Sequence, residues 1–325
     1  MMNTRKFTIS AVIFSTALLI LDSRTAFSGA AEGLDICTRT VIPSLFPFFV
    51  LSIYLTGQNI GFPGLTALCR LFRIPGKCGS ILISSFLGGY PAGAKSVADA
   101  YHSGCISRNT ANRMLTFCNQ AGPSFLFGMV ALQFPERKYP WLLWAIQFFS
   151  ALAVSWMFPP TDDTANVAVN LKPPTLSGAL RGAITVTASV CGWVIIFRVI
   201  IAFFSRWFFW ILPEQSQAFL AGVLELANGC ASLSAVENVY TRFFLAAIML
   251  SFGGICVTMQ TASVTEGLDF GYFLKGKLLQ TLIAVSFAAI AAGYPAAATA
   301  GCLIFCMIFL MKRRNKTGNP LHSVV

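Results

Sequence analysis

Charged residues are scarce in this sequence, and acidic residues are the scarcest. Only 11% of the 325 residues are Asp, Glu, Lys or Arg, and just 12 of them are acidic. A soluble domain carries about 25% charged residues. Because 56% of the residues are hydrophobic and the mean hydropathy is +0.70, this shortage excludes an ordinary soluble protein. The composition predicts an all-α polytopic membrane protein.

The sequence also lacks the groups on which enzymes and ATP-driven pumps depend. Its two histidines, His102 and His322, lie in a polar connector and in the C-terminal tail, which excludes a catalytic triad or a His-based metal site. It has no Walker motif and no dinucleotide-binding motif. Its ten cysteines form no C-x-x-C pair, and most lie in apolar runs where inert thiols are expected. We predict no enzyme activity, no cofactor and no metal site.

The net charge of +11 comes from short basic clusters at the ends of apolar segments. This distribution is typical of the positive-inside rule and gives no indication of a nucleic-acid partner. Arg5-Lys6 and the C-terminal run 312–316 predict that both termini of a multi-pass cell-membrane protein face the cytoplasm. If the apolar segments are counted as membrane crossings from a cytoplasmic N-terminus, Arg137-Lys138 falls on the outer side, against the positive-inside rule. The expected partners are the lipid bilayer and a small-molecule solute, and a homo-oligomer is left open.

The N-terminal apolar segment has two interpretations. Phe7 to Leu21 follows Arg5-Lys6 and precedes the small residues SGAAEG, a pattern that fits a cleaved signal peptide. The same pattern fits a short first membrane helix. We favour the uncleaved helix because many apolar segments follow.

The stretch from Ser84 to Asp99, SSFLGGYPAGAKSVAD, is a poor membrane helix. A continuous helix would lose about 1 kcal/mol at each glycine and about 3 kcal/mol at Pro91. Unpaired backbone groups cost several kcal/mol each in lipid, so such a break has to be buried in protein or line a wet cavity. We predict a re-entrant hairpin near residues 79–103. The alternative is a kinked helix, or a loop beside a short helix.

A second interruption, CNQAGPSF, falls within the apolar segment from Ala111 to Leu132. Its proline removes a backbone hydrogen bond, and Asn119 and Gln120 carry amides that can bind a ligand or the hairpin tip. The alternative is that these polar groups hold helices together, at about 0.6–2 kcal/mol per contact.

The second half of the chain repeats the first in the order of its features. Residues 159–176 form a linker between the halves 1–158 and 177–325. A second re-entrant hairpin is expected near residues 218–236, with its break at Asn228-Gly229. Gly253-Gly254 then lies where Gly122-Pro123 lay in the first half.

Counting from a cytoplasmic N-terminus, corresponding segments cross the membrane in opposite directions. This is an inverted repeat, in which broken helices meet at a substrate site near the bilayer midplane. The expected fold has about eight transmembrane helices and two re-entrant hairpins. The expected helices are Phe7 to Leu21, Val41 to Leu55, Ala111 to Leu132, Trp141 to Phe158, Ala183 to Phe204, Arg242 to Gln260, Leu278 to Ala292 and Ala296 to Met311.

The candidate substrate-binding residues lie at the hairpins and at the interruptions. Lys95 is the first choice for an anion contact beside a half-helix N-terminus, although it fits equally a lysine that reaches the interface and pairs with Asp99. Glu225 is a candidate for a coupling proton or ion, or for a structural hydrogen bond. The full set is Gly88, Gly89, Tyr90, Pro91, Lys95, Asn119, Gln120, Pro123, Ser124, Glu225, Asn228 and Gln260.

The segment FLGGYPAGAKSVAD, with VIPSLFPFFVLS before it and RMLTFCNQAGPSFLFGMVA after it, resembles the YlbJ-like sporulation integral membrane proteins. These belong to the wider nucleoside-recognition, or Gate-domain, family. The resemblance extends from about Gly33 to Ser263, and LELANG (Leu224 to Gly229) resembles the family's second-half motif. It implies a Gate domain and solute transport, and one branch is associated with moving dipicolinic acid during spore formation.

The sequence therefore predicts a secondary transporter or facilitator of a small polar solute. An anionic or heterocyclic compound such as dipicolinate or a nucleoside fits the resemblance. The alternative function is a membrane scaffold of an envelope or sporulation complex that does not transport.

Overall fold

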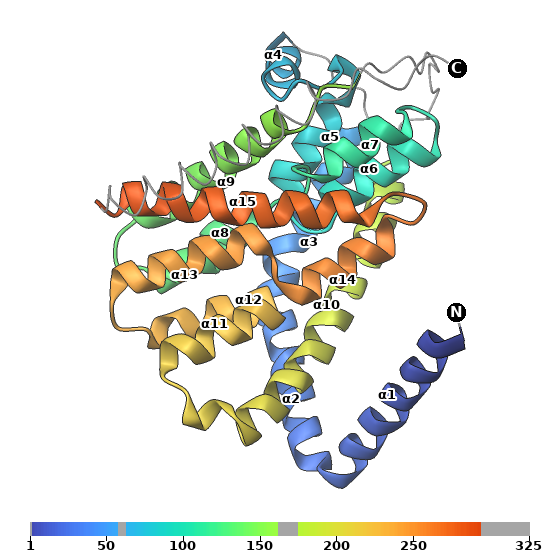
Figure 1. Cartoon of the computed structure of the whole chain (residues 1–325). Helices are drawn as coiled ribbons and strands as arrows, with labels where there is room; N and C mark the ends of the chain where they lie inside the picture. The colour runs from blue at the N-terminus through green and yellow to red at the C-terminus, as the bar shows by residue number, and fades with distance from the viewer. Residues whose placement is uncertain (1, 58–62, 162–174, 294–325) are drawn as a thin grey trace, which may run out of the picture.

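The computed structural model describes residues 2–57, 63–161 and 175–293, and every regular element in these ranges is a helix (Figure 1). This confirms the predicted all-α class. In chain order the elements are α1 (Met2–Leu21), α2 (Ser23–Ile36), η1 (Cys37–Val41), α3 (Ile42–Gly57), α4 (Pro63–Leu71), η2 (Gly76–Cys78), α5 (Gly79–Ile83), η3 (Ser84–Gly88), α6 (Ala92–His102), α7 (Arg108–Leu115), α8 (Pro123–Gly128), η4 (Val130–Gln133), α9 (Lys138–Met157), α10 (Leu176–Trp207), η5 (Phe209–Ile211), α11 (Glu214–Leu224), α12 (Leu226–Ala231), η6 (Ser232–Ala235), α13 (Val239–Phe252), α14 (Gly254–Val264) and α15 (Phe270–Ala291).

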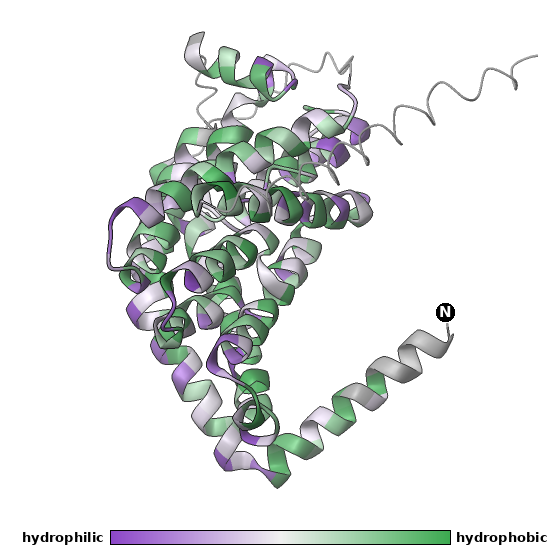
Figure 2. Ribbon diagram, turned by 60° about the vertical axis from the view of Figure 1, so that its left-hand side comes forward, coloured by the Kyte–Doolittle hydropathy of each residue, from purple (hydrophilic) through white to green (hydrophobic). Residues whose placement is uncertain are grey.

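Five helical stretches in the described part of the chain are long and apolar enough to cross a membrane. Hydrophobic residues run along most of their length, while hydrophilic residues gather in connecting segments (Figure 2). A membrane protein with several spans is therefore confirmed, although the expected count of about eight is not. The five stretches are Ser23–Leu55, Lys138–Met157, Leu176–Trp207, Val239–Val264 and Phe270–Ala291.

The first of these stretches is longer than the sequence indicated. Residues 26–40, which precede the expected helix Val41 to Leu55, continue directly into it, so that Ser23–Leu55 is one helix of 33 residues. The π-helical turn η1 leads into Pro43, and Ser44 Oγ donates to the carbonyl of Thr40 at 2.6 Å. Side-chain hydrogen bonds and local π adjustments of this kind let a membrane helix tolerate proline.

One of the other expected spans is interrupted, and another lies outside the described residues. The segment from Ala111 to Leu132 is divided into α7 and α8 by a non-helical stretch at residues 116–122. The last expected span, from Ala296 to Met311, lies outside the described residues, as does the basic run 312–316.

The long helices of the two halves pair with each other in antiparallel fashion. The α2–α3 helix lies along α10: Gly29 approaches Val199, Gly33 approaches Ile195, and Gly182 approaches Ile53. α9 lies along α15 in the same way, because Phe158 contacts Tyr272 and Ser150 contacts Gln280. Together with α13, these last two helices form one layer across the molecule (Figure 1). Corresponding helices of the predicted repeat therefore run in opposite directions.

Residues 79–102 form a helical hairpin at the place predicted for the first hairpin, while its re-entrant position in the membrane stays a prediction. α5 and η3 form one arm and α6 forms the other, with the turn at Gly89 to Pro91. Gly89 has a φ of +79°, and a Cβ there would lie 3.0 Å from the backbone nitrogen of Gly122. The tip therefore packs backbone to backbone against the interruption between α7 and α8, which only glycine permits at both positions.

The second hairpin, α11 and α12, breaks at a different residue from the one predicted. Asn228-Gly229 lies inside α12, and the extended residue is Glu225, with φ −147° and ψ 123°. The carboxylate of Glu225 accepts hydrogen bonds from the backbone nitrogens of Ala227 and Asn228, so it caps α12. The break is therefore set by an N-cap rather than by the Asn-Gly pair.

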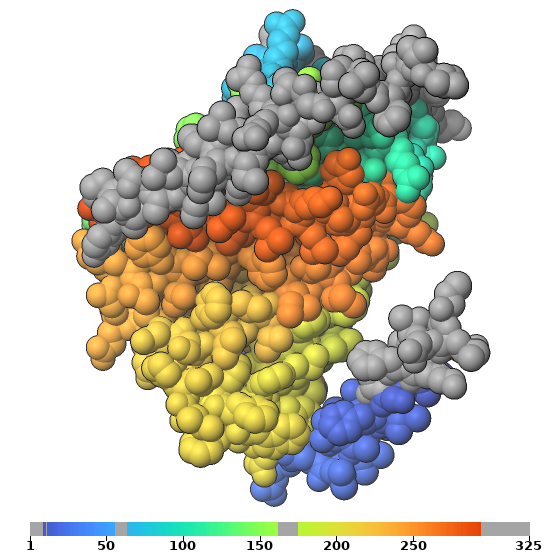
Figure 3. Space-filling view, in the orientation of Figure 1, coloured from blue at the N-terminus to red at the C-terminus, as the bar shows by residue number. Residues whose placement is uncertain are grey.

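The helix α1 projects from the rest of the molecule at its lower edge (Figure 3). Asp22, which caps α2, forms an ion pair with Arg206 of α10 at 2.9 Å. The apolar part of α1 from Val12 to Leu21 is shorter than the five spanning stretches.

Candidate functional site

Three interruptions of the chain and helix α14 meet at one small cavity of about 40 Å³. Tyr90 comes from the tip of the first hairpin, Gly122 from the break between α7 and α8, Glu225 from the break between α11 and α12, and Gln260 from α14. Its other walls are apolar side chains of α3, α8, α10 and α14. All of the lining residues are buried: Val41, Leu45, Tyr90, Ala121, Gly122, Phe125, Val190, Val194, Glu225, Leu226, Ala227, Val257 and Gln260.

Among the described residues that line this cavity, Glu225 alone carries a formal charge. One carboxylate oxygen accepts from Ala227 N at 3.0 Å, and the other accepts from Asn228 N at 2.6 Å and from Asn228 Nδ2 at 2.7 Å. No ion pair joins Glu225 to a Lys or Arg of the described residues. Within the described residues, the carboxylate is therefore stabilised by hydrogen bonds from N–H groups and not by a cation. It accepts three hydrogen bonds and can accept about four, so one lone-pair position stays unused.

Two buried amide oxygens at the centre have no hydrogen-bond partner within the described residues. Gln260 is 3% exposed and Asn119 is fully buried. Gln260 Nε2 donates to Cys256 Sγ and Asn119 Nδ2 donates to Thr261 Oγ1 at 2.9 Å, which leaves Oε1 and Oδ1 unpaired. An unsatisfied buried acceptor costs about 1–3 kcal/mol, so each such atom in a native protein calls for an explanation.

A buried lysine, Lys277, contacts Tyr90. Lys277 is 2% exposed, and its ammonium donates to Tyr90 Oη at 3.0 Å, to the carbonyl of Asn119 at 2.5 Å and to Gln280 Oε1 at 3.3 Å. It also lies 4.7 Å from the centroid of the Tyr90 ring. No carboxylate within the described ranges pairs with it. Lys277 therefore joins the first hairpin, the α7–α8 break and α15.

Amide side chains extend this polar centre between α7 and α15. Gln280 Nε2 donates to Gln120 Oε1 at 2.5 Å, and Gln120 Nε2 donates back to Gln280 Oε1 at 3.1 Å. Gln280 Nε2 also reaches Ser150 Oγ of α9 at 3.4 Å. Tyr90 Oη in turn donates to the carbonyl of Leu250 in α13 at 2.7 Å. The network connects both halves of the chain through buried groups.

The structure brings most of the predicted site residues to this centre. Tyr90, Glu225 and Gln260 line the cavity. Around it, Asn119 bonds to Thr261, Gln120 bonds to Gln280, and Asn228 bonds to Glu225. Gly88, Gly89 and Pro91 form the hairpin turn, and Pro123 and Ser124 begin α8. That these residues bind a solute stays a prediction.

Lys95 is not part of this centre. Its Nζ pairs with Asp99 at 3.0 Å, and the two side chains are 41% and 61% exposed. The pair lies on the outer face of α6, one helical turn apart, where an exposed ion pair contributes little to stability.

Lys277 and Gln280 are the functional candidates that the sequence did not reveal. The expected helix began at Leu278, which placed Lys277 at its basic end. The structure begins α15 at Phe270, capped by Asp269, so that Lys277 lies about two turns inside. The available signal was the buried stripe of Phe273, Lys277, Gln280 and Ala284 at helical spacing.

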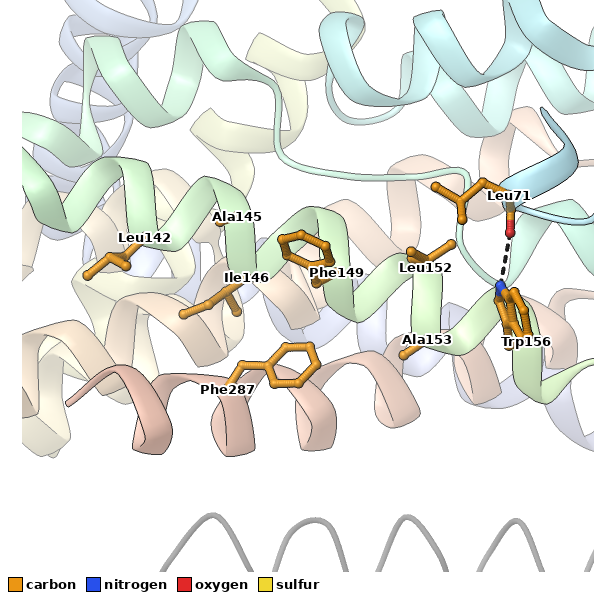
Figure 4. Close-up of a pocket in the computed structure, with 9 residues that line it drawn as sticks. All are labelled: Leu71, Leu142, Ala145, Ile146, Phe149, Leu152, Ala153, Trp156 and Phe287. Carbon is orange, nitrogen blue, oxygen red and sulfur yellow. Dashed lines mark hydrogen bonds between the residues drawn. The ribbon is translucent and has the colours of Figure 1, made fainter. Parts of the chain in front are cut away.

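One larger pocket is apolar and does not suit a polar solute. It has a volume of about 540 Å³, lies between α9 and α15, and is lined by apolar residues together with Trp156. The indole Nε1 of Trp156 is committed to the carbonyl of Leu71 at 2.9 Å (Figure 4). In the described part of the chain, no cluster of three His, Cys, Asp or Glu side chains offers a metal site.

A polar recess lies on the other side of Asn228. It has a volume of about 510 Å³, and Glu32 and Asp35 of α2 and Arg198 of α10 lie at its wall. Arg198 forms an ion pair with Glu32. Because Asn228 lines this recess and also bonds to Glu225, it separates the recess from the central cavity.

Comparison with known proteins identifies a relative. The chain is similar to the sporulation integral membrane protein YlbJ of Bacillus subtilis (strain 168), with 27% identity over 327 residues, covering 86% of this chain and 80% of YlbJ. This confirms the resemblance to the YlbJ-like proteins, while a Gate domain stays a prediction. No protein-family model and no solved structure matches the chain.

Proposed function

We propose that this homologue of the sporulation integral membrane protein YlbJ is a secondary transporter or facilitator of a small polar solute. The observation that carries the proposal is the meeting of three chain interruptions at one buried cavity, at Tyr90, Gly122 and Glu225, with Gln260 of α14 beside them. Non-helical backbone at membrane depth is stable only where it is buried in protein or lines a polar cavity. A scaffold has no need for three such breaks at one point.

The antiparallel pairing of corresponding helices supports an inverted repeat. In such transporters the two halves move against each other around a central site, so that the site opens to one side of the membrane at a time. The two helical hairpins approach the cavity from different halves of the chain, at Tyr90 and at Glu225. In our proposal both are re-entrant, and each one gates the site toward one side.

The buried polar groups support a polar solute rather than a lipid. Intramembrane ionisable residues are functional candidates by default because their burial is costly. Here Lys277 and Glu225 are both buried without an opposite charge among the described residues. Gln260 and Asn119 add oxygens that lack partners.

A binding screen of the purified protein tests the proposal. We expect one class among dipicolinate, nucleosides, nucleobases and small carboxylates to raise the unfolding temperature. A ligand present at about 100 times its dissociation constant adds roughly 2.7 kcal/mol to the free energy of unfolding. The Asn119→Ala variant should lose this shift, because it removes the unpaired Oδ1 at the centre.

The matched control is Lys95→Ala, which removes a charge from the exposed face of α6. It should keep the shift of the wild-type protein. If no compound stabilises the wild type, and a tight protein partner is recovered with it from membranes instead, the scaffold function replaces our proposal.

A further inference from the structure

We propose that the cavity between Glu225 and Gln260 binds a monovalent alkali cation. The inference starts from the size of the cavity. Its volume of about 40 Å³ holds an ion with one or two waters, since a single water occupies about 30 Å³ in the liquid. A ring compound does not fit there without a rearrangement of the surrounding helices.

The polar atoms exposed to the cavity are hydrogen-bond acceptors. The Glu225 carboxylate has one accepting position unused, and Gln260 Oε1 has no partner within the described residues. The nearby donor groups each bond to another protein group: Gln260 Nε2 donates to Cys256, Asn228 Nδ2 to Glu225, and Tyr90 Oη to Leu250. Oxygen acceptors that lack a donor, one of them on a carboxylate, favour a cation over an anion.

The charge balance indicates a monovalent ion. Glu225 is the one charged residue that lines the cavity, and no Lys or Arg of the described chain pairs with it. A single positive charge therefore neutralises the site. Divalent cations such as Ca²⁺ are held by several carboxylates, and the described residues contain no cluster of acidic ligands.

The lysine near this site does not replace the ion. Lys277 is not among the lining residues. Its ammonium donates to Tyr90, Asn119 and Gln280. The cavity and the lysine are thus two separate positions, one that lacks a cation and one that is filled by the chain's own ammonium group.

The polar recess beside Asn228 gives an ion an approach to the site. Glu32, Asp35 and Arg198 lie at its wall, and Glu32 pairs with Arg198 while Asp35 pairs with Arg39, so the recess offers polar groups without a large net charge. Asn228 then lies between this recess and Glu225. A role for the ion in driving transport rests on the proposed function, whereas binding itself does not.

The test is the unfolding temperature of the full-length protein in detergent, without solute. Na⁺, K⁺ or Li⁺ replaces choline at constant ionic strength and constant pH. We expect at least one of the three alkali ions to raise the unfolding temperature saturably, and choline to have no effect. In Glu225→Gln and Gln260→Met the half-saturating concentration of that ion should rise about tenfold or more.

The variants are chosen so that they still fold. In Glu225→Gln the amide oxygen can replace the carboxylate oxygen that accepts from Asn228 N and Asn228 Nδ2, which retains the shorter bonds of the α12 cap, while the bond from Ala227 N is lost. Gln260→Met removes an oxygen that has no partner in the described structure and keeps the length of the side chain. The control Asp99→Asn removes an exposed negative charge and should respond to the ion as the wild type does.

The absence of any ion-specific shift in the wild type would overturn the proposal, as would equal shifts in the two cavity variants and the wild type. Stabilisation by acid alone, with no effect of any alkali ion, would also overturn it and indicate protonation of Glu225. An alkali-ion shift in a protein that transports no solute would uphold the cation site and count against the proposed transport function.

Discussion

Replacing Lys277 with methionine is expected to lower solute uptake by about 100-fold while the protein remains folded. The ammonium connects the first hairpin, the α7–α8 break and α15 through Tyr90, Asn119 and Gln280. Hydrogen bonds to charged groups are worth about 1.5–3 kcal/mol, and every 1.4 kcal/mol corresponds to a factor of ten. Loss of this group removes the positive field beside the cavity and the contact that fixes the hairpin tip.

The stability of Lys277→Met should stay within about 2 kcal/mol of the wild type. Tyr90 Oη still donates to Leu250, and Gln280 Oε1 still accepts from Gln120. The carbonyl of Asn119 loses its ammonium donor, at a cost of about 1–3 kcal/mol. Removal of a buried charge, whose desolvation costs several kcal/mol, offsets that loss.

The matched control is Lys275→Met, on the same helix. Lys275 is exposed and contacts the ring of Tyr272 at 5.8 Å. This variant makes the same chemical change outside the polar centre, so its uptake should equal that of the wild type. Uptake and unfolding temperature are measured on the same preparations. If Lys277→Met takes up solute at the wild-type rate, Lys277 has no part in transport.

The Gly93→Ala substitution is expected to destabilise the protein by about 3 kcal/mol or more. A Cβ at Gly93 in α6 would lie 2.3 Å from the carbonyl oxygen of Cys118 and 2.8 Å from the Cα of Ser85. Both are backbone atoms, so no side-chain rotation relieves the clash. The hairpin and the α7–α8 break would have to separate, and thermal unfolding in detergent measures the loss.

Gly192→Ala is the control, for which we expect no loss of stability. A Cβ at Gly192, in the middle of α10, would meet nothing within 4 Å. Alanine in a helix interior is favoured over glycine by roughly 0.5–1 kcal/mol, so this variant should unfold at the wild-type temperature or slightly above it. An unchanged unfolding temperature for Gly93→Ala would contradict the close packing of hairpin and break.

The sequence allowed the general architecture to be predicted because helix-breaking residues in an apolar chain have few possible places. The turn at Gly89 to Pro91, the break before Pro123 and the break at Gly253-Gly254 all lie where the sequence put them. Their meeting at one site was also an expectation; in the structure the first two reach the cavity, and the Gly253-Gly254 break is not among its lining residues.

Tertiary contacts explain what the sequence could not predict. Glu225 breaks the second hairpin because its side chain caps α12, a signal less visible than an Asn-Gly pair. Lys277 had the appearance of an interfacial lysine, since hydropathy alone started its helix at Leu278. Its burial depends on acceptors from residues 90 and 119, which lie far away in the sequence. Lys95 was favoured for its position after the hairpin tip, but it faces outward and pairs with Asp99.

The measurement that tests the central claim most directly is solute uptake by the purified protein in lipid vesicles. A solute that stabilises the protein in the binding screen is placed outside the vesicles, and its accumulation is compared with that in vesicles without protein. Our account predicts accumulation with the wild type and with Lys275→Met, and accumulation near the background with Lys277→Met. If the wild-type vesicles take up no more of the bound solute than empty vesicles do, the protein is not a transporter of that solute and the account is contradicted.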